Sequence, residues 1–395
     1  NLNADELEQR LTLLGLVAMS DRPREKVEEA IKLCQSAGIR IMMLTGDQSA
    51  TALAVARELG IVPAEAGSSA LVNGSDLQLL SRQTISDVLD RATIIARVTP
   101  EMKLEVVRCL QERGHVVAMT GDGINDAPAL RQSNIGIAMG QTGTDMACEA
   151  SDLVITDDNF ATIVKAVEQG RMTYANISRA IGYLLTASLT CVIAVTFGLL
   201  ANTALLLQPL QLLYLNLIMH ILPGLGIVLQ RNPAGVMSCP PRRATEMLLN
   251  RYEKIQIAAR SAVIAVASLI AIIIDQRYLG QSTSTTVALA TLSLSFIFQS
   301  WTWLSEGGEN QPLLRFNIPM VWCTAINILL LGVAIYFPPF QMVLNTTSLS
   351  ADHCLLVLSA AIVSCLASLP LRQLGSEQRA SSLVSEKNVV QTVNS

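Results

Sequence analysis

Residues 120–128 read TGDGINDAP, which is the most informative stretch of the chain. It follows an apolar run, residues 116–119, that is typical of a buried strand, so Asp122 and Asp126 fall on a loop at the carboxyl end of a strand. Open α/β sheets bind their ligands at that edge. Two carboxylates on a glycine-broken turn suit Mg²⁺, which binds one or two carboxylates together with phosphate and water. The stretch therefore predicts a magnesium and phosphate site.

A second stretch supports this interpretation. Residues 44–51, LTGDQSAT, end another apolar run, and Lys103 lies on the segment between the two stretches. A threonine-bearing strand end, a lysine and a pair of aspartates, in this order, fit a site for phosphoryl transfer. The metal and the lysine would neutralise charge on the phosphate and on its attacking group.

Five motifs together resemble one family. They are DRPR at 21–24, MLTGD at 43–47, ARV at 96–98 with Lys103, MTGDGINDAP at 119–128 and DDNF at 157–160. With them the chain resembles the carboxyl-terminal part of a P-type cation-transporting ATPase of the calcium and sodium/potassium pump branch. Further matches run into the apolar second half, so the resemblance covers nearly the whole chain.

The composition points to a membrane protein. The chain has 395 residues, of which 51% are hydrophobic and 15% charged, whereas a soluble domain carries about 25% charged residues. The net charge of −4 argues against a nucleic-acid partner. The eight cysteines show no paired spacing, which favours reduced thiols over a disulfide framework. Because the chain starts at Asn1, we expect it to be a piece of a longer polypeptide.

Residues 1–165 are expected to form a partial phosphorylation domain. Strand-like runs at 14–18, 40–44, 94–97, 116–119, 135–138 and 153–155 alternate with helical patterns at 24–37, 49–59, 100–113 and 144–150. This alternation predicts a parallel α/β sheet with helices on both faces, and the resemblance implies the Rossmann-like, haloacid-dehalogenase type. We also expect a short surface helix at 86–91 and a surface loop at 63–74.

Residues 166–372 are expected to form an all-α transmembrane domain of six helices. The candidate segments are residues 178–201, 206–229, 255–274, 286–304, 317–337 and 354–370, and each approaches the ~20 residues that span a bilayer. The loop at 230–254 carries five Lys or Arg residues, whereas the loops at 275–285 and 338–353 carry only Arg277. This asymmetry predicts that residues 1–170 and that loop are cytosolic. The polar tail at 373–395 is expected to be disordered and cytosolic, and the membrane to be a plasma membrane.

The resemblance implies a metal site on the loop after residue 119. Asp122 would bind Mg²⁺, while Asp126 would support the metal and Asn125 the geometry of the metal and phosphate. Turn formation alone is the alternative role for Asp122, because turns are rich in Gly and Asp.

The resemblance also implies a phosphate and nucleotide site, with ATP as the phosphate donor. Lys103 would contact the phosphoryl oxygens, Thr45 and Gly46 would hydrogen-bond the phosphate, and Asp47 would help orient the nucleotide end of the site. A solvated helix lysine is the alternative for Lys103, and a simple turn residue the alternative for Asp47.

The residue that would be phosphorylated is absent from the sequence. The family carries it in an Asp-Lys-Thr-Gly-Thr run, and no such run occurs among the 395 residues. We expect the missing amino-terminal part, with the actuator and nucleotide-binding domains, to lie in the same polypeptide or in a partner chain, so that this chain alone would be inactive. The alternative is a non-catalytic split or degenerate pump remnant that acts as a membrane scaffold or regulatory subunit.

The candidate pathway of the transported cation contains no carboxylate. Counting from family motifs places its side chains at Ser188, Cys191, Asn216, His220 and Gln299. Ca²⁺ normally requires several oxygen ligands that include carboxylates, so the identity of the ion stays open.

His220 is expected to be the only ionisable group well inside the bilayer, and helical periodicity predicts that it shares a face with Asn216, just before Pro223. Three interpretations of His220 stay open. It is a core histidine bonded to Asn216 or to a carbonyl, part of an altered ion or proton site, or, with Cys191 and Met219, part of a site for a softer metal.

Overall fold

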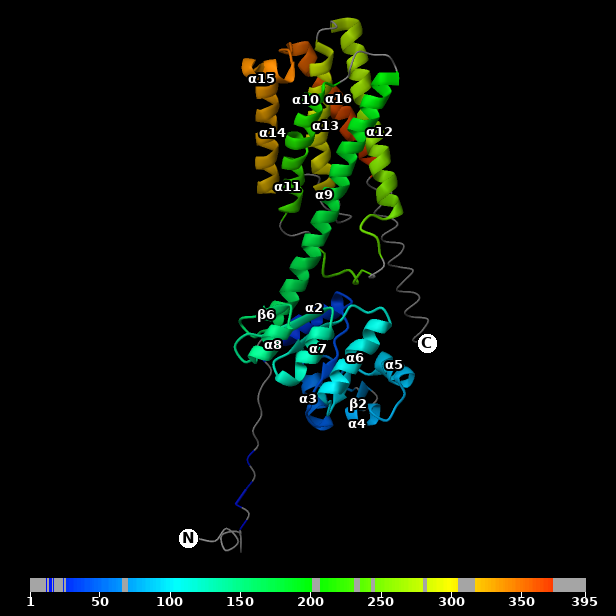
Figure 1. Ribbon diagram of the computed structural model, residues 1–395, viewed down its shortest axis with the longest axis vertical. Helices are drawn as coiled ribbons and strands as arrows, with labels where there is room; N and C mark the ends of the chain where they lie inside the picture. The colour runs from blue at the N-terminus through cyan, green and yellow to red at the C-terminus, as the bar shows by residue number, and fades with distance from the viewer. Residues whose placement is uncertain are drawn as a thin grey trace. The chain divides into compact units, whose positions relative to one another are not determined.

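The computed structural model describes residues 12, 14, 15, 17, 24, 26–65, 70–200, 207–230, 235–242, 246–279, 283–304 and 317–371. The predictions for residues 21–23 and for the tail at 373–395 therefore lie outside the described residues. The chain divides into two compact units, Asn1–Val164 and Lys165–Ser395, which are described separately (Figure 1).

The first unit contains two three-stranded parallel sheets. In one, the order is β1 (Met43–Leu44), β3 (Ile94–Ala96), β2 (Leu71–Asn73). In the other, it is β4 (Ala118–Gly121), β5 (Ile135–Met139), β6 (Leu153–Ile155). The parallel arrangement is confirmed. Among the described residues, β1 and β4 each pair on one side only, so each stands at the end of its sheet.

Helices cover both faces of the first sheet, because its central strand alternates between two cores. Ile95 of β3 packs with Val106 of α6 (Pro100–Glu112). Its neighbour Ile94 packs on the other face with Ala52 of α3 (Ser49–Glu58). This is the period of two that a strand buried on both faces requires.

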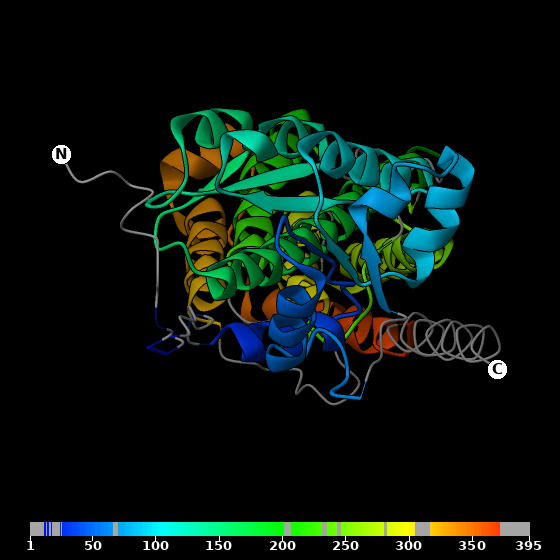
Figure 2. The same cartoon turned by 90° about the horizontal axis from the view of Figure 1, so that it is seen from below.

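Helix α6 also contributes to the core of the second sheet, where Val107 packs with Met119 of β4. The neighbouring residues Val106 and Val107 thus anchor one helix to both cores, which fixes the position of Lys103 one turn earlier. The other helices of the unit are α2 (Val27–Ser36), α4 (Gly74–Leu77), α5 (Arg82–Arg91), α7 (Ala127–Gln132) and α8 (Asp145–Ala150). Figure 2 shows the first unit from below, with helices on both sides of its strands.

Several sequence predictions for this unit need correction. The described residues of the 14–18 run form no strand, and Leu14 and Val17 are exposed. The expected loop at 63–74 contains β2, which is too short to show a clear pattern but completes the sheet beside β3. Helix α5 begins at Arg82 rather than at 86, because the Ser81 hydroxyl caps it by accepting the N–H of Thr84.

The second unit is helical. The described helices are α9 (Phe160–Leu200, which starts in the first unit), α10 (Pro209–Tyr214), α11 (Ile221–Val228), α12 (Arg251–Ile274), α13 (Ser284–Leu304), α14 (Ile318–Tyr336), α15 (Pro338–Leu344) and α16 (Ala351–Ser368). Two π-helical turns, η3 (Leu215–Met219) and η4 (Asp275–Leu279), join α10 to α11 and extend α12. Among the described residues, six helical stretches are long and apolar enough to cross a membrane, as the sequence predicts.

Helix α13 is the most buried of the six stretches, because 83% of its most apolar segment is buried inside the unit. Small hydroxyl groups connect it to α16: Ser364 donates to the Ser295 hydroxyl at 3.1 Å, and Ser368 donates to Oε1 of Gln299 at 3.1 Å. Such contacts between small polar side chains hold helices together where there is no water to compete.

Besides His220, two charged residues of this unit, Arg260 and Asp275, are fully buried. The guanidinium of Arg260 in α12 lies 4.7 Å from the ring centre of Trp303 in α13. Asp275, at the far end of α12, is also fully buried. Arg260 lies within α12, and Asp275 directly follows its last residue, Ile274.

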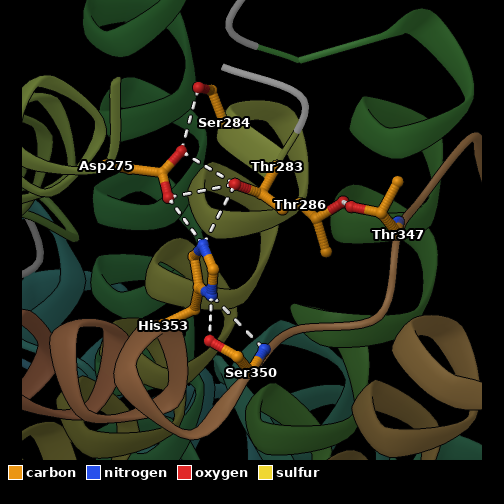
Figure 3. A network of polar contacts seen from close by, with 7 residues as sticks. All are labelled: Asp275, Thr283, Ser284, Thr286, Thr347, Ser350 and His353. Atoms are coloured by element: carbon orange, nitrogen blue, oxygen red, sulfur yellow. Dashed lines mark hydrogen bonds and ion pairs between the residues drawn. The ribbon is translucent and has the colours of Figure 1, made fainter. Parts of the chain in front are cut away.

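Asp275 is the centre of a polar network that ties three helices together at one end of the bundle (Figure 3). Its carboxylate accepts hydrogen bonds from Thr283 and Ser284 at the start of α13, and Nε2 of His353 in α16 lies 3.3 Å from its Oδ1. The backbone N–H of Ser350 donates to Nδ1 of His353 at 3.3 Å, so Nδ1 carries no proton and Nε2–H is the group that faces Asp275.

Candidate functional site

The structure brings Lys103 and Asp126 into direct contact. Nζ of Lys103 lies 2.5 Å from Oδ1 of Asp126, and their side chains are 16% and 8% exposed. The two residues come from different elements, since Lys103 is on α6 and Asp126 ends the 3₁₀ turn η2 (Ile124–Asp126) that follows β4. A charge pair this sheltered is strongly held, because losing either partner leaves a buried charge uncompensated.

Gly121 provides the room for this pair. A Cβ at Gly121 would come within 2.5 Å of Cβ of Asp126, a separation that real atoms do not adopt. The next residue, Asp122, is exposed, and its backbone carbonyl accepts the N–H of Thr144 at 2.8 Å. The loop is thus fixed by its backbone while the Asp122 carboxylate stays accessible.

The loop at 45–47 is fixed to the segment that leads into α6. Thr45 Oγ1 accepts the N–H of Asp47 at 3.1 Å. The carbonyls of Asp47 and Thr45 accept the N–H groups of Arg97 and Val98 at 3.1 and 3.0 Å. Arg97 adopts the left-handed conformation, with φ 53°, and so turns the chain from β3 toward α6.

Helix α6 then begins with two local signals. The Thr99 side chain accepts the N–H of Met102, and Pro100 occupies the first turn. These signals set where Lys103 falls. Among the described residues, no hydrogen bond or ion pair joins the 45–47 loop to Lys103, Asp122 or Asp126. The structure therefore contains two groups of site residues, each fixed by hydrogen bonds. One group follows β1 and the other follows β4, and each of these strands stands at the end of its sheet.

The oxygen donors at the β4 loop fit Mg²⁺. Asp122 offers an exposed carboxylate, and Lys103 bonds only Oδ1 of the two carboxylate oxygens of Asp126. The neighbouring residue Asn125 is also exposed. In the described part of the chain no three His, Cys, Asp or Glu side chains gather. Mg²⁺ does not need such a cluster, since it keeps several waters and takes one or two carboxylates plus phosphate.

Sequence reasoning gave no role to Asp158, although it lies in the DDNF motif. Its carboxylate is buried and accepts the N–H groups of Gln141 and Thr142 at 2.9 and 2.8 Å, and the Thr142 hydroxyl at 2.8 Å. The backbone N–H of Gln141, followed by the Thr142 hydroxyl and N–H, holds the pKa of Asp158 below its usual range. Asp158 thus anchors the loop between β5 and α8, whose residue Thr144 holds Asp122.

The candidate ion-path residues divide into two groups. Cys191, His220 and Gln299 are buried, whereas Ser188 and Asn216 are exposed in this unit. That Asn216 and His220 share a helix face stays a prediction, although Asn216 is exposed and His220 is buried. The π-helical turn η3 connects them, and in it the N–H of His220 donates to the carbonyl of Leu215, five residues back, at 3.0 Å.

His220 packs against an aromatic ring. Its imidazole stands edge-on to Phe296 of α13, with 4.5 Å between ring centres. Its Nε2 is buried and has no hydrogen-bond partner in the described part of the chain. Among the described residues, the hydrogen bond between Asn216 and His220 that one interpretation requires is therefore not formed.

Comparisons with known proteins agree with this architecture. Residues 2–134 match the model of the haloacid dehalogenase-like hydrolases, and residues 204–372 match that of the cation transporting ATPase C-terminus. The two matches correspond to the parallel α/β unit and to the helical unit.

Named relatives align along most of the chain. The calcium-transporting ATPase of Bacillus subtilis is 37% identical over 361 residues, which cover 91% of this chain and 40% of that protein. Calcium-transporting ATPase 1 of Lactococcus lactis is 39% identical over 78% of this chain and 34% of its own length. Calcium-transporting ATPase 1 of Saccharomyces cerevisiae is 34% identical over 90% of this chain and 38% of its own length.

The chain therefore spans about two fifths or less of the length of these relatives. It combines a haloacid dehalogenase-like unit with six candidate membrane-spanning helices, and it is an integral, multi-pass membrane protein. By its fold, its motifs and its relatives, the chain belongs to the P-type cation-transporting ATPases, whose carboxyl-terminal portion it matches.

Proposed function

We propose that these 395 residues supply the magnesium- and phosphate-binding half of an ATP-driven cation pump, together with its later membrane helices. The observation that carries this proposal is the sheltered Lys103–Asp126 pair beside the exposed carboxylate of Asp122. A lysine, a metal-competent carboxylate and a rigid backbone are what phosphoryl transfer requires of a protein, because its catalysis is mostly positioning and charge stabilisation.

In the proposed reaction an aspartate outside these residues attacks the γ-phosphorus of ATP. ADP leaves, an aspartyl phosphate forms, and water later hydrolyses it to aspartate and inorganic phosphate. Asp122 and Asp126 would hold Mg²⁺, which when bound offsets charge on the phosphoryl oxygens. Lys103 would stabilise the same oxygens, Thr45 and Gly46 would hydrogen-bond them, and Asn125 and Asp47 would orient the metal and the nucleotide.

The sheet arrangement supports an aspartate supplied from elsewhere. β1 and β4 each end a parallel sheet, and each is followed by one group of site residues. One further parallel strand, docked between β1 and β4, would join the two sheets. The residue at its carboxyl end would then lie between Thr45 and Asp122, where the phosphoryl acceptor is needed.

The transported species is proposed as a cation, not as Ca²⁺ in particular. The relatives are named calcium-transporting, but the five candidate path residues carry amide, hydroxyl, thiol and imidazole groups and no carboxylate. ATP-dependent uptake of Ca²⁺ and of monovalent cations, measured side by side in vesicles that contain the complete protein, separates these possibilities.

The decisive experiment is phosphorylation of the complete protein by γ-labelled ATP. We expect a hydroxylamine-sensitive phosphoenzyme that falls about 100-fold or more in Asp122→Asn and Lys103→Ala. Lys32→Ala is the matched control, because Lys32 is an exposed helix lysine that pairs with Glu28 of the same helix. A wild-type protein that forms no phosphoenzyme would favour the non-catalytic scaffold, and undiminished labelling of both variants would exclude the proposed site.

A further inference from the structure

The break in the second candidate span leaves one backbone carbonyl without its helical donor. In an α-helix the carbonyl of Met219 would accept the N–H of residue 223, but residue 223 is a proline and has no N–H. The proline ring also pushes that carbonyl away from the helix axis. An unsatisfied carbonyl inside a membrane is costly, so a neighbouring helix has to provide a donor.

Asn327 of α14 provides this donor. Its side chain is fully buried, and its Nδ2 donates to the carbonyl of Met219 at 3.3 Å. The hydrogen bond joins residues 108 positions apart in the sequence. Asn327 therefore stands in for the N–H that Pro223 removes.

The same contact lies one residue before His220 in the chain. His220 directly follows Met219, and its Nε2 is buried without a hydrogen-bond partner in the described residues. Oδ1 of Asn327 is likewise buried and without one there. Phe296 blocks one side of the imidazole at 4.5 Å between ring centres. The asparagine thus fixes a broken helix at the point where a buried imidazole nitrogen and a buried amide oxygen are left available.

We propose that Asn327 is a positioning residue of the cation path: its amide replaces the backbone donor missing at Pro223, holds the π-helical turn η3 open and keeps His220 inside the bundle. The role in a cation path rests on the proposed transport function, but the hydrogen bond itself can be tested without transport. π-Helical turns recur at functional sites, and transporters coordinate ions at broken helices.

The test is a double-mutant cycle between Asn327→Leu and Pro223→Ala in the complete protein. Pro223→Ala restores the backbone N–H, so the Met219 carbonyl no longer needs Asn327. With Pro223 in place, we expect Asn327→Leu to weaken the apparent cation affinity of phosphoenzyme formation roughly threefold to tenfold, with the maximal level kept. In the Pro223→Ala background the same substitution should change that affinity by less than about twofold.

Asn317→Leu is the matched control. Asn317 also lies at α14 and donates to a carbonyl of α11, that of Gly226 at 3.5 Å, but no proline creates the need for its bond. Its effect should be the same in both backgrounds. Equal effects of Asn327→Leu in both backgrounds would overturn the proposal.

The thermal unfolding midpoint of the purified protein is a second readout of the same double-mutant cycle, and it does not depend on activity. Asn327→Leu should lower it by about 2 °C or more when Pro223 is present and leave it nearly unchanged in the Pro223→Ala background. A protein that shows this thermal pattern but forms no phosphoenzyme would refute the proposed function and keep the hydrogen bond. If Asn327→Leu does not fold, Asn327→Ser, whose hydroxyl is too short to reach Met219, takes its place in the cycle.

Discussion

Gly121 is the residue at which the smallest change would reach the proposed site. Its missing side chain leaves the space that Asp126 fills, and Asp126 in turn holds Lys103. We expect Gly121→Ala to displace Asp126 and to lower phosphoenzyme formation about 100-fold, because a shift of about 1 Å in a phosphoryl-transfer site has that effect. The rate of labelling by γ-labelled ATP measures it.

Gly123→Ala is the control for this prediction. A Cβ at Gly123 would find its nearest neighbour 3.9 Å away, so the substitution should be tolerated although it lies in the same loop. Equal losses in the two variants would mean that the loop needs glycine for flexibility, not for the space beside Asp126.

Individual residues differ in how far the sequence could reveal them. The motifs predict Lys103 and Asp126 for one site, because each follows the carboxyl end of a strand, but they do not predict that the two side chains pair with each other. Asp158 and Asn327 could not be identified in this way. Their roles depend on which backbone groups approach them from other segments, and a carboxylate or amide in the sequence does not show its partners.

Among the elements, helix α6 was predicted well, and the irregular elements were not. Helix α6 has Thr99 and Pro100 to mark its first turn, and its predicted and observed starts agree. The π-helical turns η3 and η4 have no such signal, because the extra residue per turn is stabilised by neighbouring helices. Strand β2 was missed for the related reason that a strand of three residues carries too little pattern.

The network around Asp275 makes a prediction at this scale. Asp275→Asn would turn an amide NH₂ toward the hydroxyls and the imidazole that now donate to the carboxylate. Because the site is fully buried, we expect the variant to lose about 1–3 kcal/mol of stability. Thermal unfolding of the purified protein in detergent measures the loss. Asp352→Asn, an exposed carboxylate on the same end of α16, should change nothing, and an equal effect of both would assign the loss to charge alone.

For the whole molecule, the sequence predicted the division into an α/β part and a six-helix part, since hydrophobicity and strand–helix alternation are long-range averages. It could not predict that the strands separate into two sheets. Strand order depends on which edges meet, and nothing in the local pattern of β1 or β4 shows that each stands at the end of a sheet.

The six candidate spans predict which side of the membrane each loop faces. Cys239 is exposed in the loop between α11 and α12, whereas Asp352 is exposed at the start of α16. Two candidate spans lie between residues 1–164 and Cys239, so Cys239 should be on the same side of the membrane as residues 1–164. Five lie between residues 1–164 and Asp352, so Asp352 should be on the other side. In a Cys354→Ser background, a membrane-impermeant maleimide should label Cys239 in inside-out vesicles only. Adding Asp352→Cys to that background should add labelling of right-side-out vesicles. Cys239→Ser provides the background, and labelling of both positions from one side would refute the span count.

The single-sided pairing of β1 and β4 has a consequence for anyone who handles this chain by itself. A strand edge with free N–H and C=O groups is a template on which another chain can add a strand. β1 and β4 are two of the four edge strands in the described part of the α/β unit. Self-association through β-sheet extension is therefore a hazard separate from association of the apolar helices. Detergent covers the apolar helices and would not prevent self-association through the strand edges. A short peptide that binds to a strand edge would prevent it.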